Sequence, residues 1–179
     1  MKKVSGKIVN HDKVFNGTIE FSKNINSISE EKNFEIDNII IPGFIDLHCH
    51  GGNGFDTMGG LESIKKLSKY HLLNGTTAML PTTLTATLND TRKALIGLND
   101  LIKKNKYTTN IIGTHLEGPF INSDKLGAQP PFAQLPNIDF IKEIQKIALI
   151  RIVTLAPELK DSEKLIDYLI NNNIKVQIG

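Results

Sequence analysis

The sequence predicts an α/β protein, namely the first half of a (β/α)8 TIM-like barrel preceded by a small β-rich segment. From residue 41 onward, short apolar runs alternate with amphipathic helical stretches, which indicates βα units and a parallel sheet. Before residue 41, short β-type runs are separated by turns. The third observation is length, because residues 41–179 amount to about half of the roughly 250 residues of a complete barrel.

Residues 1–40 form the predicted β-rich segment. Its runs, such as KIV and TIEF, are interrupted by residues that favour turns. The dipeptide Asn16-Gly17 lies between KVF and TIEF, and Asn-Gly is a strong hairpin signal. The segment has too little apolar surface to fold alone, so we expect it to belong to a small β-domain.

Residues 41–179 contain the first four to five predicted βα units of the barrel. The predicted strands are IIIPGFIDLHCH, TTAMLPTT, NIIGTHLEGPF, LIRIVTLAPE and IKVQIG. The predicted helices are LESIKKLSKYHLLNG, LNDTRKALIGLNDLIKKNK, IDFIKEIQKIA and SEKLIDYLINNN. Gly75 is expected to end the first helix, and Ser162 to cap the amino end of the last.

An open, doubly wound sheet is the alternative architecture. No glycine-rich dinucleotide fingerprint follows the first predicted strand, which disfavours it. The chain stops inside a fifth predicted strand, so we expect it to be the truncated N-terminal part of a longer protein.

Composition excludes several classes of function. The net charge of +2 is too small to favour nucleic acid or a membrane surface as a partner. No window approaches the roughly 18 apolar residues of a membrane span, and the lysines near the N-terminus precede no apolar stretch of a signal peptide. The single cysteine cannot form an intrachain disulfide, so a reducing cytoplasm is expected.

Two histidines end the first predicted barrel strand in the motif FIDLHCHGG. Residues i and i+2 of a strand share a face, so His48 and His50 project together and Cys49 points the other way, into packing. Two imidazoles at the carboxyl end of a barrel strand can hold one divalent metal. Asp46 shares their parity and is expected to support them or to lie deeper in the barrel. The alternative is an ordinary polar strand end.

The motif GTHLEGPFI places Glu117 at the end of the third predicted strand. A carboxylate there can reach a metal held by His48 and His50. The alternative is a surface or helix-capping carboxylate. His115 shares the parity of Glu117, and we expect it to line the interior without binding metal.

A third stretch, KLGAQPPF, surrounds the amide of Gln129 with small and turn-forming residues. It suits a loop that folds over a substrate, although composition alone favours an ordinary surface turn. We expect the threonines of LPTT only to end a strand, and His71 to pack or to lie at the surface.

With these residues in view, the chain resembles the amidohydrolase superfamily and, within it, the N-acetylglucosamine-6-phosphate deacetylases. IPGFIDLHCHGG is similar to the superfamily's first-strand HxH motif. HLEGPF followed by KLGAQPP is more specific and resembles the deacetylases. The resemblance covers nearly the whole chain. It implies a small β-domain that the C-terminus of a full-length enzyme completes.

The resemblance implies roles for particular residues. Glu117 matches the metal-binding glutamate, and His48 and His50 match a pair that ligates metal in some members and is replaced in others. Ala128 and Gln129 match the substrate-contacting pair. Further metal histidines come from the fifth and sixth strands of such enzymes. The catalytic aspartate comes from the eighth, so we expect it beyond Gly179 and assign no catalytic residue within this chain.

The implied reaction is metal-dependent hydrolysis of N-acetylglucosamine 6-phosphate to glucosamine 6-phosphate and acetate, in amino-sugar catabolism. The implied cofactor is a divalent metal, zinc or iron, with one or two ions per site. A homo-oligomer, a dimer, is expected for the full-length enzyme, and little or no turnover for this chain alone. The alternatives are another amidohydrolase or a TatD-like nuclease, which share FIDxHxH, or a non-enzymatic truncated or decayed product.

Overall fold

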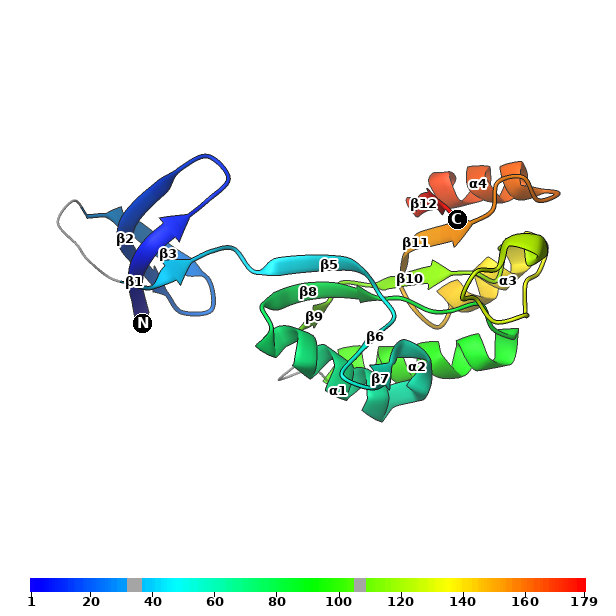
Figure 1. Ribbon diagram of the computed structural model, residues 1–179, viewed down its shortest axis with the longest axis horizontal. Coiled ribbons are helices and arrows are strands. Elements are labelled where there is room, and N and C mark those ends of the chain that lie inside the picture. The colour runs from blue at the N-terminus through cyan, green and yellow to red at the C-terminus, as the bar shows by residue number, and fades with distance from the viewer. Residues whose placement is uncertain (32–36, 105–108) are drawn as a thin grey trace. The chain divides into compact units, whose positions relative to one another are not determined.

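The computed structural model describes residues 1–31, 37–104 and 109–179. It divides the chain into two compact units, Met1–Gly43 and Phe44–Gly179 (Figure 1). Part of the predicted β-type run NFEIDN and the last residues of the second predicted helix lie outside the described residues. No helix in the described part of the chain is long and apolar enough to cross a membrane.

The first unit is a four-stranded sheet in the order β3-β2-β1-β4. Its strands are β1 (Lys2–Val9), β2 (Val14–Phe21), β3 (Ile25–Glu30) and β4 (Ile39–Ile40). β1 and β2 are antiparallel, as are β2 and β3, while β4 runs parallel to β1. Among its described hydrophobic residues, Ile8 alone is fully buried. The described part of this unit therefore has a small hydrophobic core.

The predicted hairpin turn at Asn16-Gly17 is wrong, because both residues lie inside β2. The chain turns earlier, where the amide of Asn10 donates to the carbonyl of Lys13 over 3.0 Å. A Cβ on Gly17 would lie 2.1 Å from the carbonyl oxygen of Ser29 in β3. The glycine therefore serves a close approach of two strands rather than a turn.

The second unit alternates parallel strands with helices. Its strands are β5 (Phe44–Cys49), β6 (Gly51–Gly52), β7 (Phe55–Asp56), β8 (Thr76–Pro81), β9 (Asn110–Ile111), β10 (Thr114–Glu117), β11 (Ile150–Leu155) and β12 (Lys175–Ile178). Its helices are η1 (Thr57–Gly59), α1 (Gly60–Leu73), α2 (Leu88–Lys104), η2 (Ser123–Lys125), α3 (Ile138–Gln145) and α4 (Ser162–Asn171). The β6–β7 pair is a small antiparallel hairpin.

Two three-stranded parallel sheets, β5-β8-β9 and β10-β11-β12, make up the centre of this unit. A parallel bridge between Thr82 and His115 links the end of β8 to β10. The carboxyl ends of β5, β8, β10 and β11 therefore meet at one edge. In α/β proteins this edge is where ligands bind.

Two predicted strands are divided in the structure. IIIPGFIDLHCH contributes β4 to the first unit and β5 to the second, with Pro42-Gly43 between them. NIIGTHLEGPF forms β9 and β10, and the chain turns between them at Gly113, whose φ is 145°. Few residues other than glycine adopt that backbone conformation, and this explains the break.

The predicted helix cap at Ser162 is also wrong. Asp161 occupies the N-cap position, with φ 66°, and its side chain makes no capping hydrogen bond. Ser162 is the first helical residue and is buried, and its hydroxyl donates to the carbonyl of Pro157. The serine ties the helix to the preceding loop instead of capping it.

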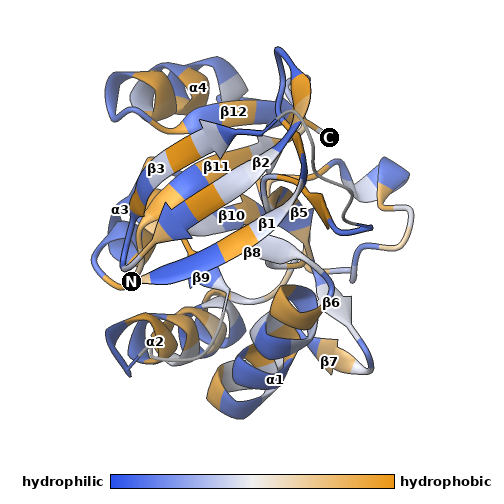
Figure 2. Ribbon diagram, turned by 90° about the vertical axis from the view of Figure 1, so that its left-hand side faces the viewer, coloured by the Kyte–Doolittle hydropathy of each residue, from blue (hydrophilic) through white to orange (hydrophobic). Residues whose placement is uncertain are grey.

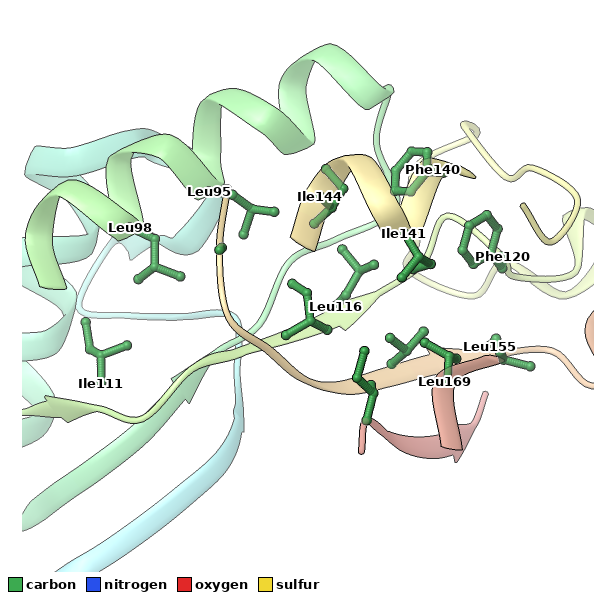
Figure 3. Close-up of a cluster of buried hydrophobic side chains, with 14 of the residues drawn as sticks. Leu95, Leu98, Ile111, Leu116, Phe120, Phe140, Ile141, Ile144, Leu155 and Leu169 are labelled. Carbon is green, nitrogen blue, oxygen red and sulfur yellow. The ribbon is translucent and has the colours of Figure 1, made fainter. Parts of the chain in front are cut away.

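Hydrophobic side chains from the helices and strands form one core in the second unit. Figure 2 shows hydrophobic and hydrophilic segments alternating along α1, α2 and α4, as expected for helices that cover a sheet with one face. In Figure 3, Leu95 and Leu98 of α2 and Ile141 and Ile144 of α3 point toward the strands around Leu116. Burying each such side chain stabilises the fold by about 1.5–3 kcal/mol.

β5 was predicted to be a buried strand, and the structure contradicts this. Phe44 is 58% exposed, Ile45 65% and Leu47 47%. Among the described residues, β5 pairs only with β8, so it is an edge strand. A continuous apolar run is typical of a strand with neighbouring strands on both sides. Among the described residues, β5 has a neighbouring strand on one side only.

Candidate metal centre

Three predicted site residues meet at the carboxyl edge of the strands. His48 lies in β5, His50 follows it, and Glu117 is the last residue of β10. Oε2 of Glu117 lies 2.6 Å from Nε2 of His48 and 3.3 Å from Nε2 of His50. The two Nε2 atoms are 3.1 Å apart. Residues separated by almost 70 positions in the sequence thus direct three donor atoms at one point.

These three atoms suit a divalent metal. Oε2 of Glu117 is buried and has no well-aligned hydrogen-bond partner among the described residues. Two imidazoles and a carboxylate form a donor set that zinc and iron accept. In a tetrahedral site with bonds of about 2.0–2.1 Å, neighbouring donors lie roughly 3.3 Å apart. Two of the separations, 3.1 and 3.3 Å, are close to that value, whereas the 2.6 Å between His48 and Glu117 is a hydrogen-bond distance.

Without a metal, the same groups interact electrostatically. Direct interaction with His50 lowers the pKa of Glu117, and burial opposes the shift. The carboxylate of Glu117 in turn raises the pKa of His50, again against burial. Each group therefore favours the charged form of the other.

His115 lies beside the three donors but is used differently. It is fully buried, and its ring packs edge-on against that of His48, with centroids 4.6 Å apart. Nδ1 is 3.1 Å from the carbonyl of Leu47, which can only accept, so Nδ1 carries the proton. Nε2 then accepts from the hydroxyl of Thr154, over 2.7 Å. Burial, with His48 nearby, lowers the pKa of His115 to about 4, so the imidazole is neutral at pH 7.

Glu117 is held on its other side by the loop that follows β10. Nε2 of Gln129 donates to Oε1 of Glu117 over 2.5 Å. Oε1 of Gln129 accepts from the backbone amide of Thr85 over 2.8 Å. The amide group thus fixes one carboxylate oxygen and leaves the other facing the histidines. Ala128, in the same loop, is exposed.

Gly118 allows the chain to turn directly after Glu117. Its φ is 72°, and a Cβ there would lie 2.1 Å from Oγ1 of Thr85. Both the backbone conformation and the space therefore require glycine. The motif HLEGPF contains this glycine for a local structural reason.

Sequence reasoning assigned too small a role to the threonines after β8. Thr82 and Thr83 are fully buried. Oγ1 of Thr82 accepts from the backbone amide of Cys49 over 2.8 Å, and Oγ1 of Thr83 accepts from that of Glu117 over 3.3 Å. They tie the ends of β5 and β10 to the strand between them. The run of hydroxyl residues in LPTTLTAT was the signal available in the sequence.

Asp46 does not follow simple strand parity. The register of β5 against β8 shifts between Asp46 and Cys49, which indicates a β-bulge. Oδ1 of Asp46 accepts from the backbone amide of His48 over 3.0 Å. Its carboxylate also lies within 4.8 Å of the thiol of Cys49 and the imidazole of His71. Asp46 therefore contacts the backbone of His48 and also lies on the side of Cys49 and His71.

Comparisons with known proteins agree with the motifs, although no family model matches the chain. The chain is 34% identical over 158 residues to N-acetylglucosamine-6-phosphate deacetylase of Bacillus subtilis (strain 168), covering 84% of this chain and 40% of that protein. It is 32% identical over 146 residues to N-acetylgalactosamine-6-phosphate deacetylase of Escherichia coli O157:H7, covering 79% and 38%.

A solved structure is also similar. The crystal structure of N-acetylglucosamine-6-phosphate deacetylase from Thermotoga maritima matches with a TM-score of 0.87 at 29% identity, covering 99% of this chain and 48% of that one. The chain thus spans less than half the length of each of these relatives. The resemblance predicted from HLEGPF and KLGAQPP is confirmed.

Proposed function

We propose that this chain, which resembles the N-acetylglucosamine-6-phosphate deacetylases over most of its length, supplies the first half of a (β/α)8 barrel and one side of its metal site. The enzyme would hydrolyse N-acetylglucosamine 6-phosphate to glucosamine 6-phosphate and acetate. The observation that carries this proposal is the convergence of His48, His50 and Glu117 at the carboxyl edge of the strands. The relatives at 34% and 29% identity support the substrate.

In this proposal the chain's own residues hold and orient a divalent metal, zinc or iron. Glu117 would provide a carboxylate oxygen, and His48 and His50 would provide Nε2 atoms, for one or two ions. Held by these residues, a metal would lower the pKa of bound water toward 7 and polarise the acetamide carbonyl. Gln129 fixes the second carboxylate oxygen, so the first keeps its direction toward the histidines. His115 stays neutral and adds no charge beside the ion.

The Ala128-Gln129 loop is proposed to touch the substrate. Ala128 is exposed, and the loop follows β10 beside the donor atoms. Gln129 already uses its amide on Glu117 and Thr85. We therefore assign Gln129 first to positioning Glu117, and Ala128 to the surface that the acetamide group meets.

The step that moves the proton requires an aspartate from the eighth strand of such a barrel, which is expected beyond Gly179. We accordingly expect no turnover from residues 1–179 alone. Dimerisation and a cytoplasmic location remain parts of the same proposal.

Activity is best measured on the natural protein purified from its source cells, after its intact mass has been determined. Acetate release is followed with N-acetylglucosamine 6-phosphate and N-acetylgalactosamine 6-phosphate as substrates, because relatives with each name match the chain. We expect faster release from the first sugar, its loss with a chelator, and its return with zinc or iron. Release that a chelator leaves unchanged, or cleavage of DNA without acetate release, would overturn the proposal.

A further inference from the structure

A second group of donor atoms lies between β5 and α1, and its members are not those of the first group. Sγ of Cys49, Nε2 of His71 and a carboxylate oxygen of Asp46 all lie within 4.8 Å of one another. The closest pair is Sγ of Cys49 and Nε2 of His71, at 3.1 Å. The backbone oxygen of Gly51 is 3.5 Å from both of these atoms.

We propose that Cys49, His71 and Asp46, with the carbonyl of Gly51, form a second site for a divalent cation of the zinc type. The set offers sulfur, nitrogen and two oxygens, which is the number of ligands in a tetrahedral zinc site. Bonds of about 2.3 Å to sulfur and 2.0–2.1 Å to nitrogen place those two ligands roughly 3.5 Å apart. A thiolate ligand favours zinc over magnesium or calcium.

The β-bulge in β5 creates this group. Positions 46 and 49 differ by an odd number, so a regular strand would direct their side chains to opposite faces. The register shift between them brings the carboxylate to the side of the thiol. One strand end therefore serves two groups, with His48 and His50 turned to Glu117 and Cys49 turned to α1.

The hairpin after β5 leaves room for His71. A Cβ on Gly52 would lie 3.0 Å from Nε2 of His71, tighter than ordinary side-chain contacts. Cys49 is 6% exposed and is part of the buried core, so its thiol is directed at the imidazole and not at solvent. A cation bound by these groups would link β5 to α1 beside the strand end that carries the two histidines.

Cobalt(II) provides a selective probe, because a thiolate ligand gives it a charge-transfer band in the near ultraviolet. Cys49 is the only cysteine of the chain, so the band reports this site alone. We expect the chain to develop the band on titration with cobalt(II), and an equal amount of zinc to remove it. The double variant His48→Gln, Glu117→Gln should keep the band, which separates this site from the proposed catalytic metal.

Two variants test the ligands. Cys49→Ser should abolish the band, and His71→Gln should weaken cobalt binding at this site by about tenfold or more. The matched control is His11→Gln, an exposed histidine in the first unit, which should leave the titration unchanged. Absence of the band in the unaltered chain, or a band that His71→Gln does not weaken, would overturn the proposal. The unaltered chain decides the question even if Cys49→Ser fails to fold.

Discussion

The two strand ends that form the candidate metal centre are built differently. Glu117 ends β10, which pairs with β11 and is bridged to the end of β8, and its side chain is 15% exposed, whereas the side chain of His48, on the edge strand β5, is 48% exposed. Thr83 and Gln129 fix Glu117 from two sides. Thr82 ties β5 to its single neighbour through the amide of Cys49. The carboxylate half of the centre is therefore held from two sides, whereas the histidine half is held by β8 and by Thr57, whose amide donates to the carbonyl of His50.

The largest difference between the two strands should appear in stability. Leu116→Ala removes a side chain that is 1% exposed, and we expect a loss of about 3 kcal/mol in the free energy of unfolding. Ile45→Ala on β5 removes one that is 65% exposed, and we expect a loss below about 0.5 kcal/mol. Urea unfolding with a chelator present measures both. Equal losses would show that β5 is as well packed as β10.

The second largest effect should be on zinc affinity, when the carboxylate of Glu117 is removed. Glu117→Gln keeps the shape of the side chain but removes its charge, and we expect zinc affinity at the first site to fall by about 100-fold, or roughly 2.7 kcal/mol. Calorimetric titration of the Cys49→Ser chain measures this without the second site. Glu158→Gln is the matched control, since Glu158 is exposed and bonds only Asn122 among the described contacts. A Glu117→Gln chain that binds zinc normally would exclude Glu117 as a ligand.

The side-chain bond of Thr82 to β5 gives a third, smaller effect. Thr82→Val removes the acceptor of the Cys49 amide and leaves a buried N–H without a partner, so we expect a loss of about 2 kcal/mol in stability. Thr77→Val is the control: it removes only an exposed 3.4 Å bond from the same strand to the carbonyl of Phe44 in β5 and should change stability little. Hydrogen exchange should show faster exchange of the amide of Cys49 in the Thr82→Val chain. Unchanged protection there would mean that β5 is held by other contacts.

Much of this architecture follows from local sequence patterns. The alternation of apolar runs and amphipathic helices predicts the βα order, because both periodicities are local. Strand parity correctly joins His48 to His50, and the position of Glu117 at the end of another predicted strand brings it to them. The bulge at Asp46 and the break at Gly113 depend on how neighbouring strands pair, which no local pattern reports. The same holds for Asn16-Gly17, where a close strand contact, and not a turn, requires the glycine.

Gln129 gives the smallest expected effect and the sharpest test of preorganisation. Its side chain bonds Oε1 of Glu117, the carboxylate oxygen turned away from the histidines. It also joins this oxygen to the backbone amide of Thr85. Groups that orient a metal ligand typically contribute 10- to 100-fold to affinity, and we expect Gln129→Ala to weaken zinc binding at the first site by about tenfold. Gln134→Ala, an exposed glutamine of the same loop, is the control. Gln129→Glu places a second carboxylate against Glu117 and should weaken binding at least as much. If both variants at position 129 bind zinc as tightly as the unaltered chain, β10 and Thr83 alone set the direction of Glu117. In that case Gln129 would be free to serve the substrate, as its match to the deacetylase motif predicts.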